Sequence, residues 1–235
     1  MAIRIAEPDT TPRSRWVWAL AVSPVLLGLN WYFARPDTMG LLGRTDSFMV
    51  VSGPRMDARL AFLLTFVLLG VVSAALARPI LGRRPMSLGM DPGNWRLGGT
   101  LLLVGVPICV LVGYLNAGNE SLAAVYPLNH SATLALAVFV PHALFYFLYY
   151  LGFEYHFRGF LLLGLQERLG PHAANVMQAG LVTLVHVGKP GIELAAAFPA
   201  SLLFGWITLR TGSIWYALVL HWVVGVSLDW FLLAG

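Results

Sequence analysis

A glutamate and an arginine lie four residues apart within an apolar stretch of the sequence. Glu154 and Arg158 occur in the segment Gly-Phe-Glu-Tyr-His-Phe-Arg-Gly, residues 152–159. Residues four apart face the same side of a helix, so the two side chains can pair. Pairing would allow both charges to be buried, and it would let Arg158 orient the carboxylate. We expect Glu154 to be functional, because an ionisable group inside an apolar span is costly and marks a functional site.

Two histidines, His186 and His221, lie in apolar segments nearer the C-terminus. A carboxylate and two imidazoles are the groups that activate a water molecule, or that hold a metal ion which does so. We therefore predict that Glu154, Arg158, His186 and His221 form a catalytic set. No cofactor is expected, since the sequence lacks the close His-x-x-x-His spacing of zinc helices. Zinc bound by Glu154, His186 and His221 stays open as an alternative.

Two further residues are predicted to assist this set. Tyr150 precedes Glu154 by one helical turn and is a candidate hydrogen-bond donor to it. Asp229 follows His221 by eight residues, about 12 Å along a helix axis. It would either face the same cavity or orient a group from another helix.

The composition requires a membrane environment for the helices that carry these residues. Of the 235 residues, 58% are hydrophobic and 11% are charged, whereas soluble domains carry about 25% charged residues. A soluble globule of this length could not bury so much apolar surface, but a bilayer can surround it. We therefore expect an all-α fold, a polytopic bundle of seven to eight transmembrane helices in one domain, residues 1–235, with a polar N-terminal tail at 1–15.

Apolar runs long enough to cross a bilayer, about 20 residues, define the predicted spans. Residues 153–167 either extend the fourth span or form a separate short helix. Tight turns between the last helices indicate antiparallel neighbours packed as one bundle. The predicted spans are 16–34, 60–77, 97–115, 132–152, 172–188, 191–209 and 213–233.

The basic residues give the expected orientation. With seven spans and a cytoplasmic N-terminus, ten of them fall on or near the cytoplasmic side and five on the other, as the positive-inside rule favours. We expect a multi-pass protein of a prokaryotic-type inner or cell membrane. We expect no nucleic-acid partner, because the basic residues lie in loops beside the spans. The two groups are Arg4, Arg13, Arg15, Arg78, Arg83, Arg84, Arg96, Arg158, Arg168 and Arg210, against Arg35, Arg44, Arg55, Arg59 and Lys189.

Three motifs in fixed order resemble those of one family. Glu154-x-x-x-Arg158-Gly-Phe-Leu is followed by His186 with Lys-Pro at 189–190, and then by Arg-Thr-Gly-Ser-Ile at 210–214 leading to His221. This order and spacing resemble the CPBP family, the CAAX-prenyl-protease and bacteriocin-processing membrane proteins, also called the ABI or Rce1-like family. The resemblance covers roughly residues 85–235.

The resemblance implies intramembrane proteolysis, in which a glutamate and a histidine activate water for attack on a peptide carbonyl. By position, Glu154 matches the second glutamate of the family's Glu-Glu-x-x-x-Arg motif and Arg158 matches its arginine. His186 and His221 match the histidines of the second and third motifs. On this basis Glu154 with His186 would activate water, His221 would stabilise the oxyanion, and the partner would be a membrane-embedded or membrane-associated peptide or protein.

The sequence departs from the family pattern at three positions. Phe153 replaces the first glutamate, Val182 replaces the aromatic residue of the second motif, and Gly225 replaces the Asn or Asp of the third. Two other readings therefore stay open. One is a catalytically inactive family member that acts as a membrane scaffold or chaperone-like partner. The other is a transporter that uses the buried Glu, Arg and His as a proton relay.

Overall fold

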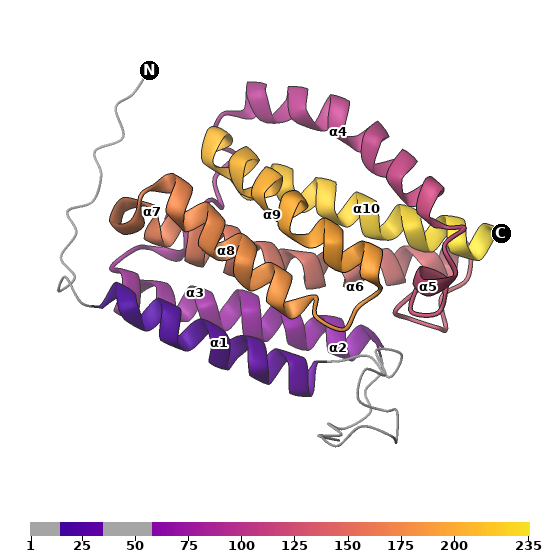
Figure 1. Ribbon diagram of the computed structural model, residues 1–235, viewed down its shortest axis with the longest axis horizontal. Coiled ribbons are helices and arrows are strands. Elements are labelled where there is room, and N and C mark those ends of the chain that lie inside the picture. The colour runs from indigo at the N-terminus through magenta and orange to yellow at the C-terminus, as the bar shows by residue number, and fades with distance from the viewer. Residues whose placement is uncertain (1–14, 35–57) are drawn as a thin grey trace.

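The computed structural model describes residues 15–34 and 58–235, and within them the fold is all helical. The membrane expectation is confirmed: six of the helices are long and apolar enough to cross a bilayer. Their order in the chain is shown in Figure 1. The elements are α1 Trp16–Phe33, α2 Ala58–Thr65, η1 Phe66–Val71, α3 Val72–Leu76, η2 Ala77–Leu81, η3 Pro85–Ser87, α4 Trp95–Asn116, α5 Glu120–Ala123, α6 Leu136–Glu154, η4 Tyr155–Leu163, α7 Gly164–Leu169, α8 Pro171–Val185, α9 Gly191–Thr211 and α10 Trp215–Ala234.

Several predicted boundaries differ from the structure, among them the span 60–77, which runs from Ala58 to Leu81, and two differences change the number of long helices. The stretch 153–167 extends the fourth span, giving a continuous helical run Leu136–Leu169 of 34 residues. The predicted span 172–188 corresponds to α8, which has only 15 residues and is not among the six long helices. The cause is local: α8 ends at Val185, where the chain turns through Gly188 (φ +87°) and Pro190 before α9.

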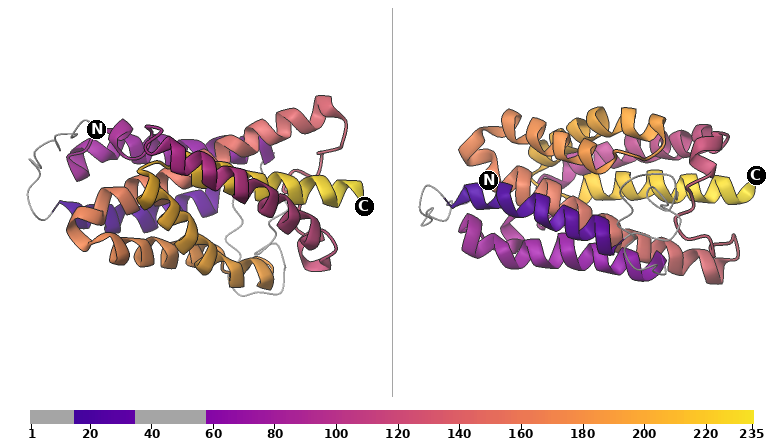
Figure 2. Two further views of the ribbon diagram at one scale, coloured as in Figure 1. Left: turned by 90° about the horizontal axis from the view of Figure 1, so that it is seen from above. Right: turned by 60° about the horizontal axis from the view of Figure 1, so that its bottom comes forward.

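The bundle is arranged around α6 and α10, which contact each other. α6 also packs on α2 and η1, while α10 also packs on α4 and α9. Both views in Figure 2 show the α8–α9 pair and the α2–α3 helix on opposite sides of α10. α4 lies at one edge of the molecule in Figure 1 and α1 at the other. The facing surfaces of α6, α8, α9 and α10 are therefore the interior of the protein.

A close approach between α6 and the second span fixes the position of α6. A Cβ atom on Gly152 would lie 2.7 Å from Phe66 Cα and 3.0 Å from Thr65 O. Any larger residue at 152 would push these two backbones apart, because the contacting atoms belong to the main chain. This contact lies two residues before Glu154, so it sets the depth and rotation of the carboxylate in the bundle.

Polarity is distributed as expected for a protein surrounded by lipid. Large apolar side chains on the outer faces are strongly exposed, as Leu103 (78%) on α4 shows. In contrast, Glu154, Arg158, His142 and Asp229 are buried in the interior. Because lipid solvates the apolar exterior, the costly polar groups lie where they can pair with one another.

Candidate active site

Glu154 is the last residue of α6 and is fully buried. Directly after it the helix widens into the π-helical stretch η4, Tyr155–Leu163. Such wide turns are rare and are found frequently at functional sites. Each residue in the widened turns is rotated about the helix axis by less than in a regular α-helix. The residues after Glu154 therefore face different directions from those that α-helical spacing would give them.

The Glu154 carboxylate forms a short hydrogen bond with His221 of α10. Glu154 Oε1 lies 2.6 Å from His221 Nδ1. An ionised carboxylate only accepts hydrogen bonds, so His221 Nδ1 carries the hydrogen and a neutral ring keeps its lone pair on Nε2. The glutamate has no exposed surface, whereas the His221 side chain is 21% exposed. The imidazole is therefore the part of this pair that a second molecule can reach.

Arg158 anchors the other carboxylate oxygen. Its Nε atom lies 3.2 Å from Glu154 Oε2, an ion pair without the alignment of a hydrogen bond. Its Nη2 atom donates to Ser201 Oγ of α9 at 3.1 Å, and Ser201 Oγ donates in turn to Gln178 Oε1 of α8 at 3.1 Å. Breaking a buried ion pair by removing one partner is costly. The ion pair predicted between Glu154 and Arg158 is thus present, and three helices hold it.

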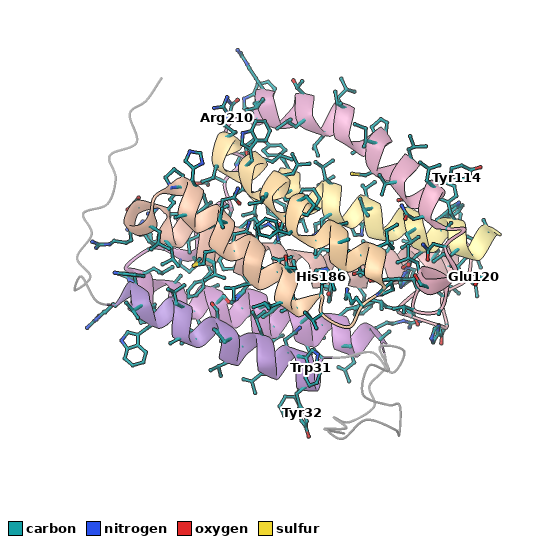
Figure 3. All side chains as sticks on the ribbon, in the orientation of Figure 1. Trp31, Tyr32, Tyr114, Glu120, His186 and Arg210 are labelled. Atoms are coloured by element: carbon teal, nitrogen blue, oxygen red, sulfur yellow. The ribbon has the colours of Figure 1, made fainter. Side chains whose placement is uncertain are left out.

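His186 lies in the turn after α8 and pairs with groups other than Glu154. Its Nδ1 donates to Val182 O at 2.7 Å, and its Nε2 lies 3.6 Å from Glu193 Oε1. Figure 3 shows His186 well inside the length of the bundle, away from its two ends. The predicted cooperation of His186 with Glu154 is therefore not a direct hydrogen bond, and the imidazole bonded to Glu154 belongs to His221.

A polar cluster next to His186 was not predicted from the sequence. Lys189 Nζ lies 2.6 Å from Glu193 Oε1, and the Tyr126 hydroxyl lies 2.9 Å from each oxygen of that carboxylate. Burial raises the pKa of Tyr126, against the opposing effect of Lys189, so the hydroxyl stays a donor. The i,i+4 spacing of Lys189 and Glu193 could have indicated their ion pair. The contact with Tyr126 could not be inferred in this way, because Tyr126 is 63 residues from Lys189 along the chain.

The Phe153 ring contacts both imidazoles. Its ring centroid lies 5.6 Å from that of His221 and 6.4 Å from that of His186, with both histidines edge-on to it. The Arg158 guanidinium carbon lies 5.9 Å from the same ring. The side chain at position 153 therefore points into the site, where its apolar ring lies next to both histidines and to Arg158.

Tyr150 lies against His221, with ring centroids 4.4 Å apart. Its hydroxyl is hydrogen bonded to the Tyr146 hydroxyl at 3.0 Å. The hydrogen bond to Glu154 that the sequence suggested is not formed. The reason is on α10: a Cβ atom on Gly225 would lie 2.3 Å from Tyr150 Oη. The absence of a side chain at Gly225 gives the hydroxyl room beyond the imidazole, away from the carboxylate.

Asp229 pairs with His142 of α6 and not with the groups around Glu154. His142 Nε2 and Asp229 Oδ2 are 2.8 Å apart, and both side chains are fully buried. Of the two roles considered for Asp229, the geometry corresponds to orienting a group from another helix. His142, Tyr146, Tyr150 and Glu154 follow at four-residue intervals on α6, so this pair continues the polar face that carries the carboxylate.

The site offers no ready-made metal cage. Within residues 15–34 and 58–235, no group of three or more His, Cys, Asp and Glu side chains converges closely enough to hold a metal ion. In the zinc alternative, Glu154, His186 and His221 would be the ligands. His221 Nδ1 and His186 Nδ1 are each engaged by a protein oxygen, which leaves only their Nε2 atoms for a ligand.

Comparison with protein families supports the reading of the motifs. The family model described as "Type II CAAX prenyl endopeptidase Rce1-like" matches residues 135–227. This range contains Glu154, Arg158, His186 and His221, and it is shorter than the 85–235 inferred from the sequence. No curated protein and no solved structure matched the chain. The segment 135–227, which holds all four predicted catalytic residues, is thus similar to the Rce1-like family, as the motifs indicated.

Proposed function

We propose that this protein is an intramembrane endopeptidase that hydrolyses a peptide bond in a membrane-associated substrate. The observation that carries the proposal is the 2.6 Å bond between the buried Glu154 carboxylate and His221 Nδ1. A carboxylate that fixes the tautomer and orientation of an imidazole is the usual device for making a histidine an effective general base. The family match supports proteolysis as the class of reaction.

In the proposed reaction His221 is the general base and Glu154 is the residue that orients it. The oxygen of a water molecule attacks the peptide carbonyl carbon while its proton passes to His221 Nε2. The tetrahedral intermediate then breaks its carbon–nitrogen bond, and His221 returns that proton to the leaving amine. Glu154 stays ionised and stabilises the positive ring between the two transfers, and Arg158 keeps the carboxylate in place.

This assignment revises the roles expected from the family motifs. Glu154 and His186 were expected to activate water together, with His221 stabilising the oxyanion. The hydrogen bonds favour His221 as the base, because Glu154 bonds to it and His186 is engaged by Val182 O. His186 would then line the site next to Phe153 and contact the substrate.

The substrate would be a peptide or protein segment held at the membrane, and lipid would surround the outer faces of the helices. The family name concerns CAAX prenyl peptides, and these are the first substrates to test. We further propose that the N-terminus is cytoplasmic, in a prokaryotic-type inner or cell membrane.

The test uses the full chain purified into liposomes with a set of membrane-anchored peptides, including prenylated CAAX peptides. We expect Glu154→Gln and His221→Ala each to lower kcat by at least about 100-fold. The matched control is Glu167→Gln, which alters a carboxylate that is 60% exposed and paired with Arg83 at the end of the bundle. Metal chelators are expected to leave the rate unchanged. A substrate that is cut equally well by wild type and Glu154→Gln would contradict the proposal.

A second candidate is a catalytically inactive family member that serves as a membrane scaffold. The position of Phe153 next to both imidazoles favours it, because an apolar ring there excludes water from part of the site. This function predicts that no peptide is cut and that Glu154→Gln retains the cellular phenotype of wild type. Cleavage of any one peptide that depends on Glu154 and His221 would rule it out.

A further inference from the structure

The hydrogen-bonding capacity of two buried tyrosines is only half used. Tyr146 and Tyr150 are almost fully buried, and their hydroxyl oxygens are 3.0 Å apart. Each hydroxyl has one hydrogen to donate, and the hydrogen can rotate to suit its partners. One hydrogen is used between them. Within residues 15–34 and 58–235 neither hydroxyl has another partner, so one buried O–H donor is left over.

The Tyr150 hydroxyl of this pair lies beside the proposed general base. The Tyr150 ring packs on His221 with 4.4 Å between centroids, and its hydroxyl reaches the position that a side chain on Gly225 would fill. Gly225 follows His221 by one turn on the same face of α10. The hydroxyl is therefore on the side of the imidazole away from the Glu154–Arg158 pair.

We propose that Tyr150 donates a hydrogen bond to the carbonyl oxygen of the substrate as negative charge develops on it. This inference rests on the proposed peptidase function and adds to it the group that stabilises the oxyanion. In the structure Tyr150 donates to Tyr146 Oη. With substrate bound, both hydroxyls would rotate so that Tyr146 donates to Tyr150 Oη and Tyr150 donates to the substrate, which makes Tyr150 a catalytic residue and Tyr146 a positioning residue. Chained hydrogen bonds of this kind strengthen one another.

The proposal needs no proton transfer from tyrosine. The Tyr150 hydrogen stays on its oxygen throughout, and the proton of the attacking water still passes through His221 to the leaving amine. A fixed donor in a site with little water stabilises a developing oxyanion strongly, because it needs no reorganisation when the charge appears.

The first experiment removes the hydroxyl and keeps the ring. Tyr150→Phe is expected to lower kcat by about 100-fold, the usual effect of losing one oxyanion donor, with KM changed by less than about twofold since the ground-state carbonyl gains little from this bond. Tyr146→Phe should lower kcat by a smaller factor. The matched control is Tyr149→Phe on the same helix, which should retain the wild-type kcat.

The second experiment displaces the hydroxyl from the opposite helix. Gly225→Ala would place a methyl group 2.3 Å from Tyr150 Oη, so the hydroxyl must move and kcat should fall. In the double variant Tyr150→Phe with Gly225→Ala, the two losses should not add, because they remove the same interaction. Thermal unfolding of each variant in the same lipid reports folding separately from kcat.

Each outcome has a distinct meaning. If Glu154→Gln abolishes cleavage while Tyr150→Phe keeps the wild-type kcat, the inference falls and the proposed function stands. A rise in KM at constant kcat, or fully additive losses in the double variant, would likewise overturn it in favour of a structural role. If wild type cuts no peptide, or Glu154→Gln still cuts, the proposed function falls and this inference falls with it.

Discussion

At the scale of single residues, the candidate site depends on a series of hydrogen bonds and one ion pair that begins at residues outside the proposed reacting groups. Gln178 bonds to Ser201, Ser201 to Arg158, Arg158 pairs with Glu154, and Glu154 bonds to His221. Each group limits the movement of the next, so the orientation of the imidazole depends on residues that never meet the substrate. Charged groups buried this way are stable only while their partners remain.

Ser201→Ala tests this series of contacts. The change leaves one guanidinium N–H of Arg158 without its acceptor, which should lower the free energy of unfolding by about 1–3 kcal/mol. The looser Glu154 should lower kcat by about 10-fold and shift the pH profile of cleavage, since the carboxylate tunes His221. The control is Ser121→Ala in the exposed helix α5. Unchanged unfolding and an unchanged pH profile would show that Arg158 does not need Ser201.

Some of this series could be predicted and some could not. Glu154 and Arg158 were recognisable because they share a helix face at i,i+4, and His221 because it is an ionisable group inside an apolar span. Ser201 and Gln178 give no such signal, since polar uncharged residues are common in membrane helices. The pairing of Glu154 with His221 and not with His186 depends on how three helices are placed, which the spacing along the chain does not determine.

At the scale of elements, the turn between α8 and α9 is tied to the loop before α6. Tyr126 from that loop bonds to both oxygens of Glu193, and Lys189 Nζ lies 3.2 Å from the Tyr126 hydroxyl. Glu193 Oε1 also lies 3.6 Å from His186 Nε2, so this contact helps to hold His186 in place.

Tyr126→Phe should release the tie while leaving the Lys189–Glu193 pair intact. Losing the hydroxyl removes the donor shared by both carboxylate oxygens, which is worth about 1–3 kcal/mol because one partner is charged. Amide hydrogen exchange in residues 122–132 is expected to rise by about 10-fold or more. Tyr114→Phe is the control, since that side chain is 60% exposed on α4. Equal amide hydrogen exchange in the two variants would show that the Tyr126 hydroxyl does not hold this loop in place.

The elements themselves show which features of the fold the sequence determines. Spans 16–34, 97–115 and 213–233 were predicted within about two residues because hydrophobic length sets them. The extension of α6 through Tyr155–Leu163 was left open, because the charged residues of that stretch suggested a boundary. The helix continues through this stretch because Arg158 is buried against Glu154 and Ser201. Local hydropathy does not reveal a partner such as Ser201, which lies in another helix.

At the scale of the whole molecule, basic residues gather at one end of the bundle. Arg83 pairs with Glu167 there, and Arg210 is seen at that end in Figure 3, opposite to Tyr114 and Glu120. α1 begins at this end and α10 finishes at the other (Figure 1). The positive-inside rule favours the basic end as the cytoplasmic one.

Cysteine labelling tests this orientation in intact cells. Cys109 is buried in α4 and would first be changed to Ser. Against that background, a membrane-impermeant maleimide should label Ser121→Cys from outside and should label Ser87→Cys only after the cells are opened. The reverse pattern would place the N-terminus outside. A denatured sample of each variant serves as the control, because it shows that the introduced cysteine can react with the maleimide.

The brevity of α8 has a consequence for the lipid around the protein. Its 15 residues span about 22 Å, against a hydrocarbon layer of about 30 Å. The charged pair that follows it, Lys189 and Glu193, is therefore expected to lie closer to the bilayer centre than the ends of the longer helices. Hydrophobic mismatch of this kind thins the adjoining leaflet. We therefore expect the acyl-chain length of the host bilayer to influence how readily water reaches the proposed site.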